Sequence, residues 1–232
     1  LPWGQMSYWG AQVIVNLFGA VPFIGPDLAV WIRGDYVVSD ATLNRFFAFH
    51  VIAIPLVLLG LVAAHLLALH EVGSNNPDGV EIKKHKDPRT GIPLDGIPFY
   101  PYYVVKDIVG VVVFLMVFSA IVFFAPEMGG YFLEYNNFVP ADPLQTPAHI
   151  APVWYFTPYY SILRAVPPMF GSQFPGVLAM GLSVVVFFFL PWLDRGAVKS
   201  IRYRGGVYKF ALMLFVISFL ILGYLGTAPT NV

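Results

Sequence analysis

The chain has 232 residues, of which 58% are hydrophobic and only 11% are charged, and its 13 basic and 13 acidic residues cancel to a formal net charge of zero. A soluble domain would be about 45–50% apolar and about 25% charged, so the composition indicates an integral membrane protein. Zero net charge argues against a nucleic-acid partner, which takes a basic face, and the lack of cysteine excludes disulfides and Cys-ligated metals.

The chain begins with two short apolar stretches, "MSYWGAQVIVNLFGAVPFIG" and "DLAVWIRGDYV". Both are too short or too interrupted by Gly and Pro to cross a bilayer, which takes roughly 20 apolar residues. We predict short helices that lie at the membrane surface. Because the chain starts with Leu1 and no signal peptide precedes the first apolar run, we expect it to be part of a longer protein.

Four longer apolar stretches follow, and each has the length of a membrane-spanning helix. They run from Phe46 to about His70, from about Val104 to Phe124, from about Pro175 to Leu193 and from about Val207 to Leu225. The predicted fold class is therefore all-α: a polytopic transmembrane helical bundle with four spans in this chain and short surface helices in the outer loops.

The basic residues give the orientation. Four follow the first span and five follow the third, whereas the long segment between the second and third spans has only Arg164. By the positive-inside rule, the first two segments face the cytoplasm. In chain order we expect outer surface helices (1–43), a transmembrane helix (44–72), a cytoplasmic-side loop (73–103), a transmembrane helix (104–125), an outer loop (126–174), a transmembrane helix (175–193), a cytoplasmic-side loop (194–206) and a transmembrane helix (207–228).

The first span contains two histidines, His50 and His65, although it has no acidic residue, Lys or Arg between Phe46 and Leu69. An ionisable residue within a span suggests function, while a lone His bonded to a neighbouring helix is a common alternative. Fifteen residues at about 100° each return the second imidazole to within about 60° of the first and separate the two by roughly 22 Å along the axis. Neutral imidazole is a metal ligand, so one face offers a haem ligand near each leaflet.

A haem held by two histidines needs a second imidazole from another helix. The other histidines are His70, His85 and His149, and none lies within a predicted span. We therefore expect the partner ligands to belong to a different chain or to a preceding part of this one.

Successive segments of the chain resemble cytochrome b, the membrane subunit of the quinol:cytochrome c oxidoreductase or cytochrome bc complex, in its bacterial form. They are "LPWGQMSYWGAQVI", "RFFAFH", "HLLALHEVGSNNP", "YYVVKDIVG", "PADPLQTPAHIAPVWYFTPYYSILRAVP" and "DRGAVKSIRYRG". By this resemblance the chain is a central-to-C-terminal portion that starts after the third transmembrane helix of the family and stops before its eighth. The helix that supplies the other two haem ligands would then lie outside it.

The resemblance implies two b haems. His50 is similar to the axial ligand of the low-potential haem on the outer side, and His65 to that of the high-potential haem near the cytoplasm. Mitochondrial members space these histidines by fourteen residues, whereas this chain uses fifteen, like the photosynthetic relative. The extra residue falls in "HVIAIP", just before Pro55, where we predict a local π-bulge.

A quinone-reduction site is expected at the cytoplasmic ends of the first two spans. His70 emerges there beside Ser74, while Lys106 and Asp107 open the second span at the same level. These groups donate protons and hydrogen bonds, and with the resemblance we assign His70 and Asp107 as the catalytic proton relay. The alternative, favoured for Lys106 taken alone, is interfacial anchoring.

A quinol-oxidation pocket is expected on the outer side. Gly10 would allow close approach of a flat ring, and the aromatic residues supply an apolar lining with polar tips; the alternative is a packed loop cap, for Trp154 in particular. By resemblance the pocket walls are Met6, Gly10, Val13, Pro152, Val153, Tyr155 and Tyr160.

Most members of the family have Pro-Glu-Trp-Tyr where this chain has "PVWY", and that Glu is commonly assigned as acceptor of a quinol proton. Val153 has no proton site. We expect water with Tyr155 to act as the catalytic replacement, and Glu134 or His149 of the same loop are the alternatives. The segment "TPAHI", Thr146 to Ile150, is similar to the docking surface of the Rieske iron–sulfur protein and should be partly exposed.

The resemblance implies a quinol–cytochrome c reductase that passes electrons from ubiquinol through two haems to an inner quinone, coupled to proton translocation. The implied partners are the Rieske protein, cytochrome c1, a second copy of the complex and membrane lipid, and the implied location is the bacterial inner membrane. One alternative is a di-haem anchor of another quinone-linked dehydrogenase. Another is a haem-free transporter that uses His50 and His65 as a proton relay.

Overall fold

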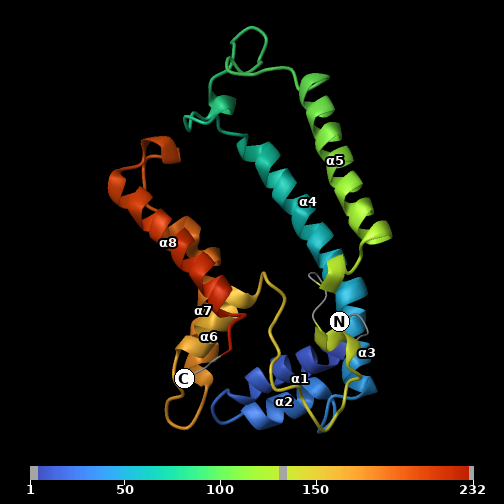
Figure 1. Cartoon of the computed structure of the whole chain (residues 1–232). Coiled ribbons are helices and arrows are strands. Elements are labelled where there is room, and N and C mark those ends of the chain that lie inside the picture. The colour runs from blue at the N-terminus through green and yellow to red at the C-terminus, as the bar shows by residue number, and fades with distance from the viewer. Residues whose placement is uncertain (1–4, 131–134, 230–232) are drawn as a thin grey trace. The chain divides into compact units, whose positions relative to one another are not determined.

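The computed structural model describes residues 5–130 and 135–229. Within these ranges the chain forms α-helices, short 3₁₀ turns, a π-helix and isolated bridges, without a β-strand (Figure 1). The predicted all-α class is confirmed. By internal contacts the residues divide into two units, Leu1–Leu59 with Pro140–Val232 and Gly60–Val139, which are described separately below.

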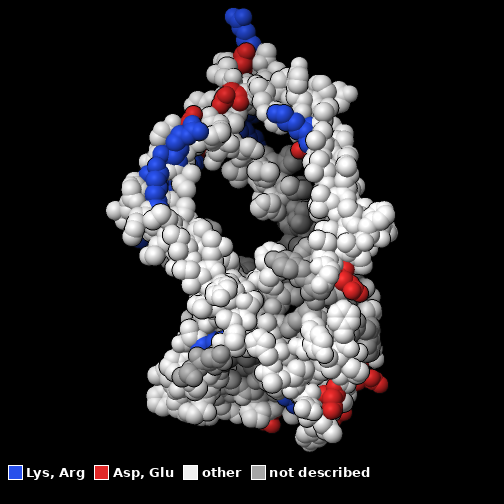
Figure 2. Space-filling model, in the orientation of Figure 1, with Lys and Arg blue, Asp and Glu red and all other residues white. Residues whose placement is uncertain are grey.

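Four described helices are long and apolar enough to cross a membrane, as predicted. Figure 2 shows white helix bodies on this face, with the coloured charged side chains mainly toward their ends. The first span begins earlier than predicted, because the helical run already starts at Asp40, and the other three agree with the predicted ranges to within two residues at each end. The four spans are Asp40–Val72, Tyr102–Phe124, Phe174–Leu193 and Gly206–Leu225.

The two short helices at the start of the first unit are α1 (Gln5–Gly19) and α2 (Gly25–Arg33), which pack on each other. Trp9 and Val15 of α1 are 1% exposed, and Ala29 of α2 is 3% exposed. Burying a large side chain such as that of Val15 contributes roughly 1.5–3 kcal/mol, and the methyl group of Ala29 contributes less. The prediction of two short helices is confirmed, while their place at the membrane surface stays a prediction.

The first span is a single helical run built from α3 (Asp40–Ala48), the π-helix η1 (Phe49–Ala53) and α4 (Ile54–Val72). Pro55, the second residue after the π-helix, has no N–H to donate. A π-turn accommodates one extra residue in a helix. The π-bulge predicted before Pro55 is therefore confirmed.

The start of this run is fixed to the end of α2 by side chains. Thr42 is fully buried, and its hydroxyl donates to the Arg33 carbonyl at 2.6 Å. The Arg45 guanidinium donates to the carbonyls of Trp31 and Ile32 at 3.2 and 3.1 Å. Because the last carbonyls of a helix lack partners within it, a cation there satisfies them and matches the helix dipole.

The other helices of the first unit are α6 (Thr157–Ala165), α7 (Phe174–Leu193) and α8 (Gly206–Leu225), with a 3₁₀ turn, η5 (Ile201–Tyr203), before α8. Short surface helices were predicted in the outer loops without bounds, and α6 is a helix of this kind within 126–174. It packs against both α7 and α8.

One hydrogen bond and two close backbone contacts hold α6 in place. The Ser161 hydroxyl donates to the Leu222 carbonyl of α8 at 2.5 Å. A Cβ on Gly176 of α7 would lie 2.6 Å from the Leu163 carbonyl oxygen, and one on Gly226 after α8 would lie 2.3 Å from that of Thr157. Glycine is required at both positions because the backbones approach too closely for a side chain.

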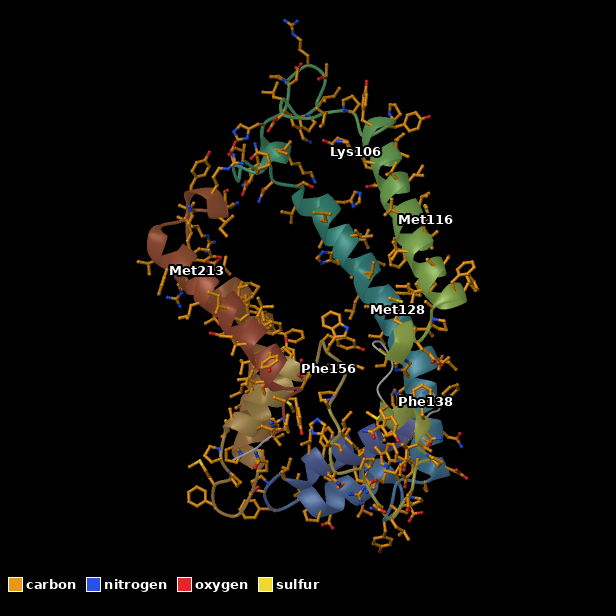
Figure 3. The ribbon with its side chains drawn as sticks, viewed as in Figure 1. Lys106, Met116, Met128, Phe138, Phe156 and Met213 are labelled. Atoms are coloured by element: carbon orange, nitrogen blue, oxygen red, sulfur yellow. The ribbon has the colours of Figure 1, made fainter. Side chains whose placement is uncertain are left out.

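The second unit contains the later part of α4, the loop 73–103 and α5 (Tyr102–Phe124). Lys83 donates from Nζ to the carbonyls of His70, at 2.7 Å, and Glu71, which satisfies the end of α4. The loop itself is braced by a 2.8 Å bond from the Asn76 amide to Asp95. After α5, the 3₁₀ turns η3 (Met128–Gly130) and η4 (Tyr135–Phe138) carry Met128 and Phe138, labelled in Figure 3.

Candidate functional site

The two intramembrane histidines lie in different parts of the helical run. His50 is in the π-helix and His65 is in α4, within apolar sequence. A π-turn accommodates one extra residue in a helix, so a fifteen-residue spacing that contains one has the phase of a fourteen-residue spacing in a plain α-helix.

Both imidazoles are free to bind a cofactor, because no other described residue occupies their ring nitrogens. Each side chain is exposed, and no described residue forms a hydrogen bond with either ring. A polar ring without a partner is costly in a membrane. The described ranges hold no group of three His, Cys, Asp or Glu side chains that would bind a bare metal ion, whereas a haem brings its own ring of nitrogen ligands and takes a single imidazole from each site.

At the C-terminal end of α4, His70 is held by its own helix. Its Nδ1 lies 2.7 Å from the Leu66 carbonyl, and because a carbonyl only accepts, Nδ1 carries the hydrogen. Nε2 of the neutral ring is then an acceptor, and it donates only when the ring is doubly protonated. Ser74, two residues beyond the helix, is exposed.

Lys106 and Asp107 lie in the second turn of α5. The Lys106 ammonium lies 5.0 Å from the centre of the Tyr103 ring, a cation–π contact, and Lys106 is labelled in Figure 3. Asp107 is exposed. Across the described part of the chain, no hydrogen bond or ion pair joins either residue to His70 or Ser74, so the structure places the four in one unit without bringing them into direct contact.

The predicted outer residues on α1 occupy one face of the helix. Met6, Gly10 and Val13 are spaced by four and three residues, so they are neighbours on the helix surface. A Cβ added to Gly10 would meet no heavy atom within 4 Å, while Val13 is 37% exposed. The helix surface at Gly10 is therefore free of neighbouring atoms, which leaves room for a flat ring.

The segment Pro152–Phe156 forms a chain of aromatic rings on a turn, in which the Phe156 N–H donates to the Val153 carbonyl at 2.8 Å. The Trp154 and Tyr155 rings meet edge to face at 5.4 Å, and the Tyr155 and Phe156 rings lie 4.9 Å apart; Phe156 is labelled in Figure 3. Trp154 is 81% exposed, so this chain alone does not support its role as a packed cap. Val153 and Tyr155 are 52% and 54% exposed.

Tyr160 lies on α6 rather than in a loop. The Arg164 guanidinium stands 5.1 Å from the centre of its ring and donates to the Ala228 carbonyl at 3.1 Å. The contact therefore links Tyr160 to the end of α8.

Two hydrogen bonds connect α1 and the residue after it to the later outer segment. The Ala141 N–H donates to the Gln5 side chain at 2.6 Å, and the Ser172 hydroxyl donates to the Ala20 carbonyl at 3.1 Å. Both walls of the predicted pocket thus belong to one unit of the chain.

The segment 146–150 is partly exposed, as predicted: Thr146, Ala148 and His149 are exposed and the other two are half-buried. Glu134, named above as a possible proton acceptor, lies outside the described residues. His149, the other alternative, is exposed and has a contact of its own.

Sequence reasoning missed a buried polar pair on α1. Trp9 Nε1 and Gln12 Oε1 are inaccessible and have no hydrogen-bond partner among the described residues. Nearby, the Tyr8 hydroxyl donates to the Val38 carbonyl at 3.1 Å, and burial, followed by the negative charge of Asp142, raises the pKa of Tyr8. A Trp and a Gln one turn apart are the signal in the sequence, but it does not reveal that their polar atoms are unpaired.

Comparison with known proteins gives a consistent result. The family described as cytochrome b (N-terminal)/b6/petB matches residues 1–158, and the family described as cytochrome b (C-terminal)/b6/petD matches residues 140–232. Cytochrome b of Allochromatium vinosum is 64% identical over 100% of this chain and 56% of the relative. Cytochrome b of Rhodospirillum rubrum is 48% identical over 100% of this chain and 53% of the relative.

A chain of a solved hyperthermophilic respiratory Complex III superimposes with a TM-score of 0.83 at 38% identity. The match covers 100% of this chain and 58% of that chain. The chain thus spans a little over half the length of these relatives.

Proposed function

The chain belongs to the cytochrome b family, and we propose that it forms the central membrane part of the cytochrome b subunit of a quinol:cytochrome c oxidoreductase. Ubiquinol is oxidised at the outer site. One electron goes to a Rieske protein and on through cytochrome c1 to cytochrome c, and the other crosses the membrane to an inner quinone. The observation that carries the proposal is the helical run Asp40–Val72, which holds His50 and His65 in apolar sequence without a partner among the described residues.

His50 and His65 would each hold one b haem through an imidazole nitrogen, and the remaining protein ligands would come from outside this chain. The bound haems supply two one-electron carriers at different depths of the membrane. The chain's own part is to present a neutral imidazole nitrogen at each depth. The π-helix at Phe49–Ala53 supports this role, because a π-turn accommodates one extra residue in the helix that carries both histidines.

At the outer site, the open face at Gly10 and the exposed ring of Tyr155 bind the quinol ring by stacking. Oxidation of a quinol to a quinone releases two protons along with two electrons. Val153 has no proton site, so the Tyr155 hydroxyl, which bonds to no described residue, passes one proton to water. Met6, Val13, Pro152 and Tyr160 complete the pocket.

At the inner site, His70 and Asp107 deliver the two protons that a quinone takes up with two electrons. The Nδ1–H of His70 stays bonded to the Leu66 carbonyl, so its proton leaves from Nε2 of the doubly protonated ring. Ser74 and Lys106 donate hydrogen bonds that orient the quinone oxygens. The exposure of all four side chains supports access for a quinone.

The exposed segment 146–150 supports docking of a Rieske protein on the outer side, and the chain works in a dimeric complex with cytochrome c1. The bacterial relatives support the bacterial inner membrane as the location. The four apolar helices make it a multi-pass membrane protein.

The test is a reduced-minus-oxidised visible spectrum of the purified complex. Two b-type bands of different potential are expected, and their absence would favour the haem-free transporter. Sensitivity of quinol oxidation to inhibitors of the outer pocket then separates the proposal from a di-haem anchor of another dehydrogenase. A two-haem complex whose turnover ignores such inhibitors contradicts the outer-site assignment.

A further inference from the structure

The last turn of α4, which carries His70, is held by a lysine of the loop that follows it. The ammonium of Lys83 donates to the His70 carbonyl at 2.7 Å and also to the Glu71 carbonyl. Lys83 lies in the 3₁₀ turn η2 (Ile82–Lys84), within the loop between α4 and α5 (Figure 1). A side chain of the loop thus contacts the backbone of a residue assigned to the inner site.

These bonds account for part of the end of the helix. The last four carbonyls of a helix lack partners within it. At the end of α4, the Gly73 N–H donates to the Leu69 carbonyl at 2.8 Å, and Lys83 donates to the next two. A cation at this end also matches the helix dipole. Helix ends fray readily, so we expect the last turn of α4 to fray when Lys83 is removed.

A glycine gives the Lys83 stem its place. Gly73 follows α4 with a φ of 84°, the left-handed conformation that favours glycine just after a helix. A Cβ on Gly73 would lie 2.8 Å from the Cβ of Lys83. Lys83 therefore packs closely against the end of α4, a contact that a lysine projecting only into water does not need.

The ring of His70 depends on the geometry of the same turn. Its Nδ1 bonds to the Leu66 carbonyl at 2.7 Å, and this bond fixes the ring and thus the direction of Nε2. Leu66 and His70 are four residues apart, so they face each other only while the backbone between them is helical. A bond to the His70 carbonyl therefore acts on Nε2 through the backbone.

We propose that Lys83 is a positioning residue of the inner quinone-reduction site, because it holds the last turn of α4 and so keeps Nε2 of His70 directed at the quinone. This role rests on the proposed function, in which a proton leaves from that nitrogen. Lys83 itself delivers no proton. A catalytic group misplaced by about 1 Å costs about a hundredfold in rate, so a turn that frays for part of the time should cost roughly tenfold.

The test measures reoxidation of the high-potential haem in purified complexes at increasing quinone concentration. Lys83→Met keeps an apolar stem but removes the donors, and it should lower the maximal rate about tenfold with little change in the KM for quinone. Lys83→Arg should restore most of the rate, because a guanidinium can also donate to two carbonyls. Lys84→Met is the matched control: Lys84 pairs with Glu81 within the loop, and its loss should leave the rate unchanged.

The same measurement in a His70→Asn background separates positioning from general stability. If Lys83 acts through His70, Lys83→Met should have little further effect once the imidazole is gone. A loss by the same factor in both backgrounds, or a wild-type rate for Lys83→Met alone, would overturn the role of Lys83 and leave the inner site in place. A wild-type rate for His70→Asn alone would instead overturn the inner site, and the role of Lys83 with it.

Gly73→Ala is a second variant, and it keeps both Lys83 and His70. Its Cβ meets the Lys83 stem, so it should lower the maximal rate in the same way, and Lys83→Met should add little to it. Retention of both haem bands shows that each variant is folded. An unchanged rate in Gly73→Ala would contradict the placement of Lys83 against the end of α4.

Discussion

The short helix α6 and the membrane-span helix α5 differ in how much they contact the rest of the chain. Four of the nine residues of α6 are buried, whereas none of the 23 residues of α5 is. Helix α6 has hydrogen bonds and backbone contacts to its neighbours, while α5 beyond Asp107 is apolar on nearly every side. A helix that is apolar all round is stable only in a membrane or beneath other protein.

The same contrast separates the two kinds of site. Tyr160 and the aromatic turn before α6 are positioned by contacts within this chain. His50, His65, His70 and Asp107 stand on helix surfaces that this chain leaves open. The residues of the proposed outer site are therefore held largely by contacts within the described chain, whereas we propose that the intramembrane histidines and the inner site depend on cofactors, lipid and further protein.

The largest expected effect comes from removing a ligand on an open helix surface. His50→Leu should abolish the lower-potential b band, and His65→Leu the higher-potential band, because a leucine of similar size leaves no nitrogen for the iron. Redox titration of the purified complexes at the b bands measures this. Since neither side chain packs within the described chain, the other band should persist.

Retention of both bands in either variant would refute the ligand assignment. Loss of both bands from a complex that still assembles would mean that the two sites are not independent. Leu66→Ala, one position beyond His65, is a control for changes in the same span without loss of a nitrogen.

The next effect is expected at Asp107. Asp107→Asn should slow reoxidation of the high-potential haem by quinone about a hundredfold, because an amide forms hydrogen bonds but cannot transfer a proton near neutral pH. Outer quinol oxidation in the first turnover should be unchanged. Flash or stopped-flow kinetics at the b bands separates the two steps.

Asp95→Asn is the matched control, since it removes a carboxylate from the preceding loop, where Asp95 only braces Asn76. Normal inner-site kinetics in Asp107→Asn would leave that residue an interfacial anchor. Equal slowing in both variants would point to loop structure rather than proton transfer.

A larger side chain at Gly226 tests the packing of α6 against the end of α8. Gly226→Ala places a Cβ 2.3 Å from the Thr157 carbonyl oxygen, and such overpacking costs about 1–3 kcal/mol. We expect a lower melting temperature and weaker outer quinol oxidation with both haem bands retained. Gly181→Ala in α7 is the control, because its Cβ would meet nothing within 4 Å, and it should be neutral or slightly stabilising. Equal melting temperatures would show that α6 does not depend on this contact.

The membrane-spanning helices were predictable from the sequence, whereas the short packed helix α6 was less predictable. Apolar length identifies a span whatever surrounds it, and the histidine spacing with Pro55 predicted the π-helix. By contrast, the bounds of α6 were not predicted because "TPYYSILRA" is short and mixed in polarity, and its stability comes from Gly176, Gly226 and Ser161 contacts that join distant parts of the chain. The unpaired atoms of Trp9 and Gln12 were also invisible, because pattern reveals a face but not a missing partner.

A smaller effect is expected where the chain departs from its family, at Val153. We expect Val153→Glu to be tolerated and to change the pH dependence of quinol oxidation, since an apolar pocket raises the pKa of a carboxylic acid. Tyr155→Phe should slow turnover more in the native background than beside the introduced Glu, with a coupling of about 1 kcal/mol. Steady-state cytochrome c reduction against pH for both single variants and the double variant measures it. An equal cost of Tyr155→Phe in both backgrounds would mean that the two groups share no proton route.

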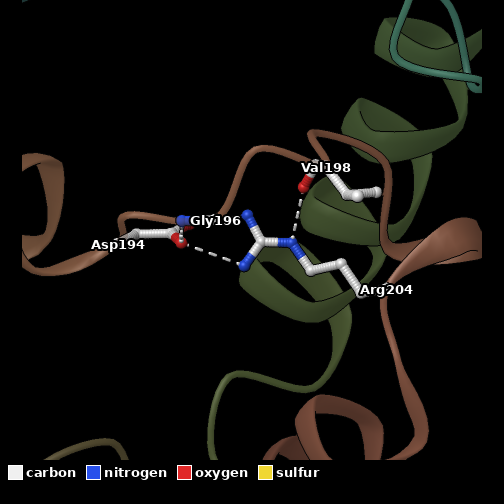
Figure 4. Close-up of polar contacts among 4 residues, drawn as sticks. All are labelled: Asp194, Gly196, Val198 and Arg204. Carbon is white, nitrogen blue, oxygen red and sulfur yellow. Dashed lines mark hydrogen bonds and ion pairs between the residues drawn. The ribbon is translucent and has the colours of Figure 1, made fainter.

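The smallest effect is expected at Asp194, in the loop between α7 and α8. Arg204 donates to its carboxylate at 2.7 and 3.1 Å and the Gly196 N–H donates at 3.1 Å (Figure 4). These bonds, with Arg204 first, hold the pKa of Asp194 below its ordinary value of 3.8. A depressed pKa contributes stability that is fully present above the ordinary value and is lost as the pH falls through the folded value.

The wild-type complex should therefore lose a little more thermal stability than Asp194→Asn on acidification from about pH 5 to about pH 3, and the two should differ by a constant amount above that range. The difference is small because the Asp194 side chain is 47% exposed, and solvent and salt screen such a pair. Asp27→Asn, an exposed carboxylate in the first turn of α2, controls for the general loss of one negative charge. Parallel melting curves of wild type and Asp194→Asn across this range would show that the pair shapes the loop without stabilising it, whereas a difference that closes on acidification, and is reduced by salt at neutral pH, would identify the ion pair as its source.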